Sequence, residues 1–226
     1  MDSGYYAAMT GLVARNQALD AAAANLANAQ TPGYRAEREY FRSALLGPDA
    51  QDSQLGRTVN NYGLLGGDQL YLGQGQLQQT GNPLDLAVEG EGFFAVQTPT
   101  GVRYTRDGSF HRTQSGQLVS ASGEPVLSAT GQPIPVPPGD VSVGSDGVLS
   151  VAGGTGSIVG VFTFPAGTRL TPEGANRYAP PPWVAAVVSK GGAVRQGAIE
   201  AANQDMITGT LDLKALGDPP ALPGWQ

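Results

Sequence analysis

Few residues of this chain are of types that do chemistry, and they are not grouped into a recognisable site. The single histidine, His111, lies in a segment with a β pattern, and the chain has no cysteine. A zinc site needs several His, Cys or carboxylate ligands, so we expect His111 at the surface, without a metal. Ser189 and Lys190 are merely neighbours in sequence, which does not indicate a catalytic dyad.

The densest group of carboxylates offers one enzymatic alternative. It consists of Asp85, Glu89, Glu91 and Asp107. Paired carboxylates hydrolyse glycosidic bonds when their separation suits the reaction, so a cell-wall hydrolase is one hypothesis. Acidic residues at strand ends and turns are also ordinary in a β domain. Gly73 and Gly75 lack the third glycine and the following helix of a dinucleotide fingerprint. We therefore expect no enzyme, no cofactor and no small-molecule substrate.

Charge and hydropathy argue against two classes of partner. The formal net charge is -6, and the 13 basic residues form no run. Binding to nucleic acid or to an anionic membrane surface needs clustered Lys and Arg. No stretch of about 18 apolar residues is present, and the beginning, with Asp2, lacks the pattern of a cleaved signal peptide. We expect no nucleic acid, no membrane insertion, and export without a cleaved signal peptide if the protein leaves the cytoplasm.

The element with the clearest pattern is at the beginning of the chain. From Asp2 to about Gln30 there is no proline, and the spacing predicts a helix over residues 3–29 that Pro32 and Gly33 end. Steps of four and three define the seam of a heptad repeat. The seam residues are Tyr5, Met9, Leu12, Asn16, Leu19, Ala23 and Leu26.

Two interpretations of this helix are open. It could pack on its own domain, as amphipathic helices commonly do. The seam is narrow, however, and the stretch after it has little apolar content, so we expect the helix to pair with another helix. Asn16 within the seam would then fix the register.

From Asn82 onward, short apolar runs are separated by turns that contain Gly, Pro or Asp. This pattern predicts an antiparallel all-β domain, and Asp107-Gly108 is a hairpin signal within it. Helical spacing returns between Ala198 and Leu216. The second seam consists of Ile199, Ala202, Met206, Leu213 and Leu216.

The predicted fold is mainly β with terminal α-helices, an antiparallel all-β domain being inserted between N- and C-terminal coiled-coil-forming helices. The predicted parts are the N-terminal helix (1–33), an extended connecting region with short strands (34–80), the all-β domain (81–190) and a C-terminal segment with a short helix (191–226).

Two motifs resemble the signatures of the flagellar rod and hook proteins. The first runs from Ala22 to Tyr34, where Asn-Leu-Ala-Asn is followed by Thr-Pro-Gly-Tyr, and the second runs from Asn82 to Phe94. The resemblance covers about residues 2–200. The residues of the first motif that match are Asn25, Leu26, Asn28, Thr31, Pro32, Gly33 and Tyr34. The chain departs from the family where its C-terminal helix is short.

The resemblance implies a structural subunit of the flagellar basal-body rod, which is the axial drive shaft for motility and spans the periplasm. Terminal helices would form an inner coiled-coil layer, and the β domain an outer layer. The implied partners are copies of the chain, other rod and hook axial proteins, and the flagellar type III export apparatus. Proximal rod members are the most similar, with distal rod or hook-type subunits as the alternative. A soluble adhesin module is an alternative of another class.

Two expectations concern the connection between helix and domain. Pro32 and Gly33 would form a joint that sets the angle of the inner helix, because Pro32 restricts Thr31 and Gly33 is free to adopt a positive φ. Replacing Gly33 would then leave the β core's melting temperature almost unchanged. Limited proteolysis should leave a resistant core from about Tyr34 to about Arg195.

Overall fold

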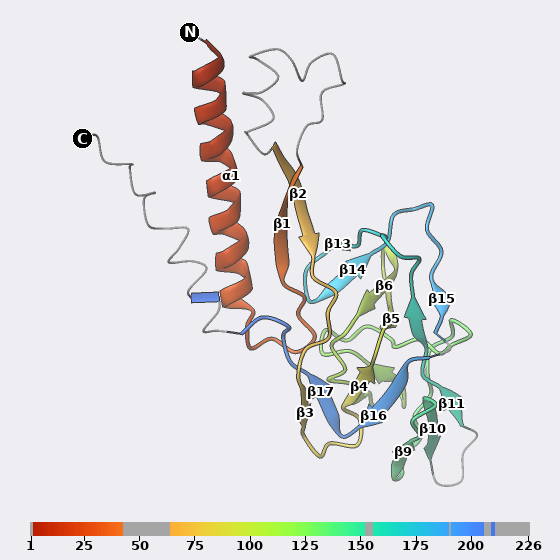
Figure 1. The fold of residues 1–226 in the computed structure, drawn as a ribbon. Coiled ribbons are helices and arrows are strands. Elements are labelled where there is room, and N and C mark those ends of the chain that lie inside the picture. Colours follow the sequence, from red (N-terminus) through yellow and green to blue (C-terminus); the bar gives the residue numbers. More distant parts are fainter. Residues whose placement is uncertain (1, 43–63, 152–155, 190, 206–208, 211–226) are drawn as a thin grey trace. The chain divides into compact units, whose positions relative to one another are not determined.

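The computed structural model describes residues 2–42, 64–151, 156–189, 191–205 and 209–210. These residues fold as two compact units. Unit 1 contains described residues 2–27, 37–42, 64–71, 204–205 and 209–210, and unit 2 contains 28–36 together with the described part of 72–203. Figure 1 labels most elements of both units.

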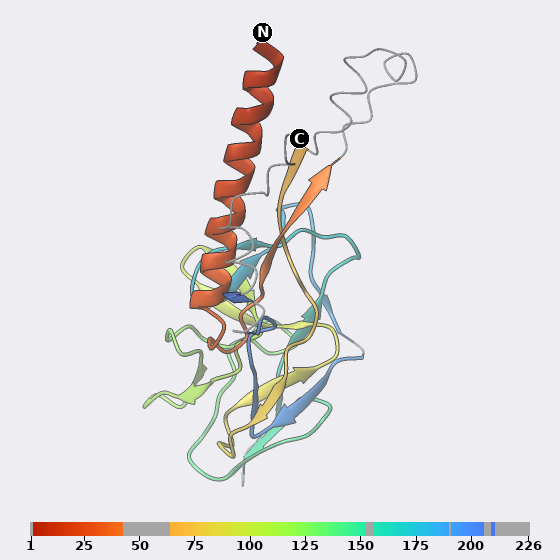
Figure 2. The ribbon, with the colours of Figure 1, turned by 60° about the vertical axis from the view of Figure 1, so that its left-hand side comes forward.

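Unit 1 consists of a long helix and a β-hairpin. The helix α1 (Asp2–Ala27) has the predicted position, and it lies beside β1 (Glu37–Arg42), which pairs antiparallel with β2 (Leu64–Leu70) (Figures 1 and 2). The helix ends before the Pro-Gly break, as expected from the geometry that proline imposes on the residue before it. Among the described helices, none has the length and apolar character that a membrane span requires.

The largest sheet of unit 2 has six antiparallel strands. Its centre is the hairpin of β5 and β6, in which Thr98 pairs with Gly101 across the turn. From edge to edge the strands are β13 (Thr171–Pro172), β14 (Arg177–Ala179), β6 (Gly101–Thr105), β5 (Phe93–Thr98), β12 (Val161–Thr163) and β15 (Val187–Val188).

Smaller sheets complete unit 2. Three of them have two strands: β16 (Ala193–Gln196) with β4 (Leu86–Glu89), β17 (Ala198–Glu200) with β3 (Leu77–Gln79), and β7 (His111–Arg112) with β8 (Leu118–Val119). One has three strands: β11 (Ser157–Ile158), β10 (Val148–Val151) and β9 (Val141–Val143). All these pairings are antiparallel. The predicted antiparallel, mainly β fold with an N-terminal helix is therefore confirmed.

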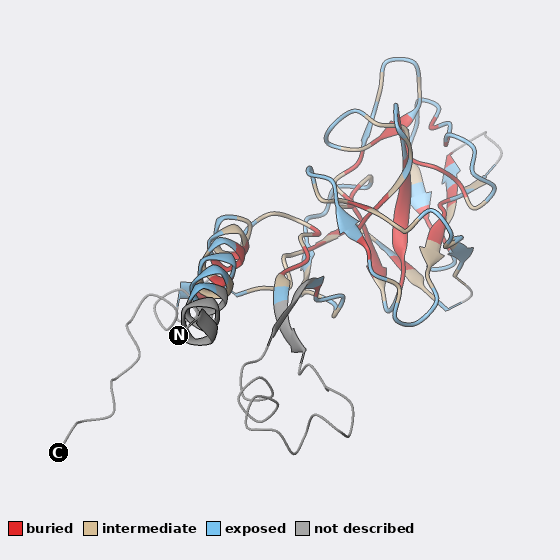
Figure 3. Ribbon diagram, turned by 90° about the horizontal axis from the view of Figure 1, so that it is seen from above, coloured by how far each residue is buried: buried red, intermediate tan, exposed pale blue. Residues whose placement is uncertain are grey.

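The two faces of the β5 strand pack against different groups of side chains. Phe94 lies in the aliphatic core, with its ring 5.1 Å from that of Phe110. Phe93 points to the other face, where its ring is 6.0 Å from the rings of Phe164 and Tyr178. This alternation is that of a strand buried on both faces. Figure 3 shows the buried residues concentrated in the strands of unit 2.

The predicted hairpin at Asp107-Gly108 is wrong. The strand before it, β6, pairs with β5 and β14, whereas β7 pairs with β8. Gly108 instead allows two backbones to approach: a Cβ added there would lie 1.6 Å from the Leu86 carbonyl oxygen. A glycine in such a pattern marks a close backbone approach as readily as a turn.

The predicted helix from Ala198 is wrong at its beginning. Residues Ala198–Glu200 form β17, in which Ala198 and Glu200 are buried and Ile199 is less so. Ala202 lies outside any helix or strand. The seam residues Met206, Leu213 and Leu216 lie outside the described residues, while Gly209 and Thr210 are helical.

The division into units differs from the boundaries predicted at 33/34, 80/81 and 190/191. Asn28–Ala36 belongs to unit 2, whereas the prediction divided this segment between the N-terminal helix (1–33) and the connecting region (34–80). The hairpin of β1 and β2 occupies part of the predicted connecting region, and unit 2 extends to Asn203. Residues 31–33 and 196–203 therefore lie within the folded β unit, beyond the Tyr34 and Arg195 limits expected for a resistant core.

Candidate functional site

The motif around Gly33 is the first part of the candidate site, and it is folded into unit 2. Gly33 has a φ of +69°, in the region that glycine adopts without steric cost. Its amide donates to the Glu200 carbonyl oxygen over 2.7 Å. A Cβ at Gly33 would lie 2.1 Å from the Asp107 amide nitrogen. The backbone of the motif is thus pressed against the turn after β6, and no side chain fits between them.

Two residues of the β13–β14 region hold the same motif. The Asn176 side-chain amide donates to the Pro32 carbonyl oxygen over 2.9 Å. Asn176 itself has a φ of 54°, next to Ala175 at 47°, and such positive values are uncommon outside glycine. The Tyr178 hydroxyl accepts from the Arg35 amide over 2.9 Å. This turn, with its two positive φ values, thus places the Asn176 amide group against the motif.

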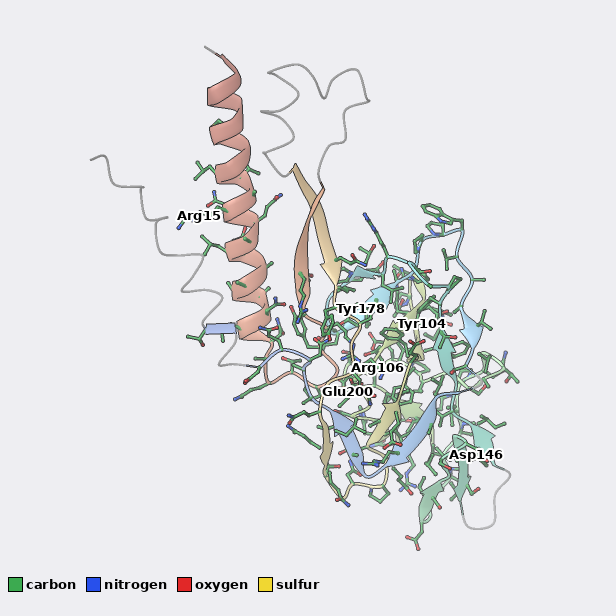
Figure 4. The ribbon with its side chains drawn as sticks, viewed as in Figure 1. Arg15, Tyr104, Arg106, Asp146, Tyr178 and Glu200 are labelled. Carbon is green, nitrogen blue, oxygen red and sulfur yellow. The ribbon has the colours of Figure 1, made fainter. Side chains whose placement is uncertain are left out.

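A buried ion-pair cluster, formed by Arg35, Arg106 and Glu200, adjoins the motif. Glu200 Oε1 accepts from Arg35 Nη2 over 2.8 Å, and Oε2 accepts from Arg106 Nη1 over 2.9 Å. The side chains of Arg35 and Glu200 are fully buried. Figure 4 shows Glu200 and Arg106 inside unit 2, with Tyr178 nearby. The cluster joins the N-terminal motif, the end of β6 and the end of β17.

Burial is the largest electrostatic influence on Arg106. It lowers the pKa of the Arg106 guanidinium, and the attraction of Glu200 opposes that effect while Arg35 adds to it. Arg106 also donates to the carbonyl oxygens of Val88 and Gly90, and its guanidinium lies 5.3 Å from the Phe93 ring. Such hydrogen bonds and ring contacts compensate for lost hydration.

The three side chains of the cluster carry one net positive charge, since two arginines share one glutamate, and Glu91 adds a further attraction on Arg106. The Nε and Nη1 atoms of Arg35 and the Nε atom of Arg106 are buried and have no hydrogen-bond partner among the described residues. Glu200 is consequently the residue on which the burial of both arginines depends, because removing the shared partner of buried charges is strongly destabilising.

Asn203 adds a second layer of polar contacts. Its side chain accepts from the Ala36 amide over 2.7 Å and donates to the Gly73 carbonyl over 2.8 Å. Its own amide donates to the Tyr34 carbonyl over 3.2 Å. Asn203 and Glu200 thus bind the same N-terminal motif from two adjacent points.

In unit 1, Asn25 is the motif residue with the clearest role. It is buried at the end of α1, where its Nδ2 donates to the Glu37 carbonyl over 2.8 Å and its Oδ1 accepts from the Glu37 amide over 2.9 Å. The amide side chain therefore completes a backbone-like pair of hydrogen bonds with the first residue of β1.

None of the buried positions of α1 within its described part belongs to the predicted seam. The buried positions of the helix are Ala18, Ala21, Ala22 and Asn25, and they lie along one side in Figure 3. Of the seam, Met9, Leu12, Asn16 and Ala23 are exposed, Leu19 and Leu26 are half-buried, and the side chain of Tyr5 is not among those described.

Gly209 lies near one residue of this seam. A Cβ added at Gly209 would lie 3.7 Å from Leu26 Cδ1, so Gly209 is close to the end of α1 within unit 1.

The residues considered for catalysis have structural partners or lie in solvent. Asp85 accepts from the Asn82 side chain, Glu89 pairs with Arg195, and Asp107 accepts from the Ser109 amide. His111 is exposed in β7. Within the described part of the chain, no group of three His or carboxylate residues is placed to hold a metal ion.

Sequence reasoning missed the roles of Arg35, Arg106, Glu200, Asn203 and Asn176. One signal was available for Glu200: it is a lone carboxylate after Ala198 and Ile199, in an Ala-rich stretch. Buried charges need partners, and Arg35, which directly follows the first family motif, and Arg106 were candidates. Asn176 carried no such signal.

Comparison with known proteins bears on both units. Residues 6–35 match the family profile "Flagella basal body rod protein", and residues 87–151 match "Flagellar hook protein FlgE/F/G D1 domain". The first match contains the motif from Asn25 to Tyr34, and the second contains strands β5 to β10.

Individual relatives of the chain are also flagellar rod proteins. The flagellar basal-body rod protein FlgF of Mesorhizobium japonicum is 33% identical over 182 residues, which are 80% of this chain and 73% of the relative. FlgF of Caulobacter vibrioides is 32% identical over 205 residues, 90% of this chain and 83% of the relative. FlgG of Bacillus subtilis is 30% identical over 228 residues, 93% of this chain and 81% of the relative.

Proposed function

Because the chain belongs to the family of flagellar basal-body rod proteins and is a structural subunit of the rod, we propose that it polymerises through its terminal segments into the axial drive shaft. Its place is the flagellar basal body. In this proposal the shaft spans the periplasm, the partners are copies of the chain and other rod and hook axial proteins, and the flagellar type III apparatus exports the subunit.

The observation that carries the proposal is that α1 has two different faces. Ala18, Ala21 and Ala22 are buried within unit 1, whereas Met9 and Leu12, on another side of the helix, are 46% and 57% exposed. Exposed apolar side chains in a row indicate a surface for another protein. We assign this row, which continues through Asn16, Leu19, Ala23 and Leu26, to helix pairing between subunits in an inner coiled-coil layer.

The Thr31–Tyr34 motif is, in this proposal, the joint between the pairing helix and the outer β unit. Support comes from its hydrogen bonds to Glu200 and Asn176 and from the close backbone contact of Gly33. The proposal contains no catalytic step.

The assignment is tested by placing a charge in the exposed row. Leu12→Asp should leave the isolated subunit folded, because Leu12 is exposed, and should abolish rod assembly, because an unpaired carboxylate in a dry helix interface costs several kcal/mol. The readouts are circular dichroism of the purified chain, and motility and basal-body imaging in a strain that lacks its own rod subunit.

Gln17→Asp is the matched control, since Gln17 is exposed and belongs neither to the exposed row nor to the buried face of α1. It should retain motility. Normal rods in the Leu12→Asp strain would show that the exposed row is not an assembly surface.

A further inference from the structure

The two units are joined where the chain passes between them four times, at 27/28, 36/37, 71/72 and 203/204. Two of these crossings lie within a few residues of groups that Asn203 binds, and a third follows Asn203 itself. We propose that Asn203 is an anchor that ties the connecting segments together at the point where they leave unit 2. Its consequence for rod assembly rests on the proposed function, whereas the anchor itself is a property of the isolated chain.

The geometry uses both ends of the Asn203 side chain. Oδ1 accepts from Ala36, the last residue before the second crossing, and Nδ2 donates to Gly73, which follows the third crossing by one residue. The fourth crossing begins directly after Asn203 itself. A carboxamide provides a donor and an acceptor together, so neither an aspartate nor an alanine can make both contacts.

Glu200 reinforces the same anchor. Its Oε1 accepts from the Gly75 amide over 2.6 Å, and its backbone oxygen accepts from the Gly33 amide over 2.7 Å. Gly75 also lies so close to the chain near Asn203 that an added Cβ would be 2.2 Å from the Ala201 oxygen. The connecting segments are therefore bound by two residues that lie close together in the chain, Glu200 and Asn203.

These contacts join parts of the chain that are far apart in sequence. Ala36 and Asn203 are 167 residues apart, and Gly73 and Asn203 are 130 residues apart. The apolar core of unit 2, which contains Phe94 and Val126, does not include Asn203. Loss of the Asn203 side chain should accordingly release the connecting segments while the core stays folded.

The test uses the purified full-length chain and three variants. In Asn203→Ala, hydrogen exchange of the Ala36 amide should accelerate roughly tenfold, the scale of one lost hydrogen bond. Trypsin cleavage after the exposed Arg38 and chymotrypsin cleavage after the exposed Tyr71 should both become faster. The melting temperature of the β core should change little.

Asn203→Asp separates an anchor from general destabilisation. It retains the acceptor for Ala36 and loses the donor to Gly73, so cleavage after Tyr71 should accelerate while the Ala36 amide stays protected. Asn82→Ala is the control, because the Asn82 side chain contacts Asp85 in an exposed turn of unit 2; it should change neither readout.

Unchanged exchange and cleavage in Asn203→Ala would overturn the proposal. Uniformly faster exchange and cleavage at all sites, together with a lower melting temperature, would also overturn it. If Asn203→Ala does not fold, the proposal is judged by whether Asn203→Asp accelerates cleavage after Tyr71 while the Ala36 amide stays protected. Motility is measured separately. If the Asn203 variants show faster exchange and cleavage but form normal rods, Asn203 is an anchor in the isolated chain that has no role in assembly. If Leu12→Asp does not impair the rods, that result counts against the proposed function alone.

Discussion

At the scale of single residues, the distinctive feature is a buried glutamate shared by two buried arginines. A buried ion pair is weak support for stability in itself, because desolvation offsets most of the attraction. Removing one partner is different, since it leaves an uncompensated charge. Glu200 holds Arg35 and Arg106 together, so its loss removes the carboxylate that both of them bind.

We predict that Glu200→Gln lowers the free energy of unfolding of unit 2 by about 3–5 kcal/mol, the cost of breaking a buried ion pair. Glu173→Gln is the matched control, because Glu173 pairs with Arg103 over 2.5 Å at the surface, where its side chain is 38% exposed. That variant should cost less than about 1 kcal/mol. Urea unfolding of both measures the difference, and equal losses would contradict a special role for Glu200.

A second residue-scale prediction concerns Gly33. Gly33→Ala must adopt a φ of +69° and place its Cβ 2.1 Å from the Asp107 backbone. Gly81→Ala is the control, because Gly81 has a φ of +77° with no heavy atom within 4 Å of an added Cβ. The control should cost about 1–2 kcal/mol, and Gly33→Ala should cost at least about 2 kcal/mol more, from overpacking.

This outcome differs from the expectation that changing Gly33 leaves the β core almost unaffected. The reason is that Gly33 belongs to unit 2, so a clash at Gly33 is a clash inside the β unit. Equal melting temperatures for the two glycine variants would restore the simpler view of Gly33 as a helix stop.

At the scale of elements, the helix α1 has a buried face and an exposed face. One face packs within unit 1, and the row through Leu12 is exposed. The helix therefore need not fold only upon finding another subunit, since Asn25 already fixes its end to β1. Small residues on the inner face allow the helix to lie close to the hairpin.

The two asparagines of α1 should behave differently when each is replaced by alanine. Asn25→Ala removes both hydrogen bonds to Glu37, so it should destabilise unit 1 by about 1–3 kcal/mol and speed hydrogen exchange of the Glu37 amide. Asn16→Ala should leave the isolated chain unchanged, because Asn16 is exposed. Its effect should appear only in assembled rods, as disturbed helix register. Similar exchange in both variants would show that Asn25 does not tether the helix.

At the scale of the whole molecule, the chain consists of two units whose segments are interleaved. Unit 2 is built from Asn28–Ala36 and Leu72–Asn203, with a segment of unit 1 inserted between them. The polar network of Arg35, Glu200 and Asn203 connects the two segments of unit 2. A cut in the inserted segment should therefore not separate them.

We predict that limited proteolysis leaves a complex in which a peptide containing Asn28–Ala36 remains bound to the fragment ending near Asn203. Intact mass and size-exclusion chromatography would identify both pieces in one peak. The Glu200→Gln variant is the control and should release the peptide more readily. A resistant core that begins after Ala36 and lacks the peptide would contradict this arrangement of unit 2.

The sequence by itself determined the local features. The spacing of apolar residues and the Pro32-Gly33 break specify α1 and its end, the turn-separated apolar runs specify the antiparallel strands, and two motifs identify the family. Each of these depends on residues close together in the chain, where periodicity and turn chemistry act directly.

Tertiary structure alone decided which face of α1 is buried, where the units divide, and which charges meet. The segment Ala198–Glu200 fits helical spacing, yet it forms β17 because pairing with β3 buries Ala198 and places Glu200 beside Arg35 and Arg106. Those partners are distant in sequence, so no local pattern contains them, and the free energy of burying and pairing a charge outweighs a weak helical preference.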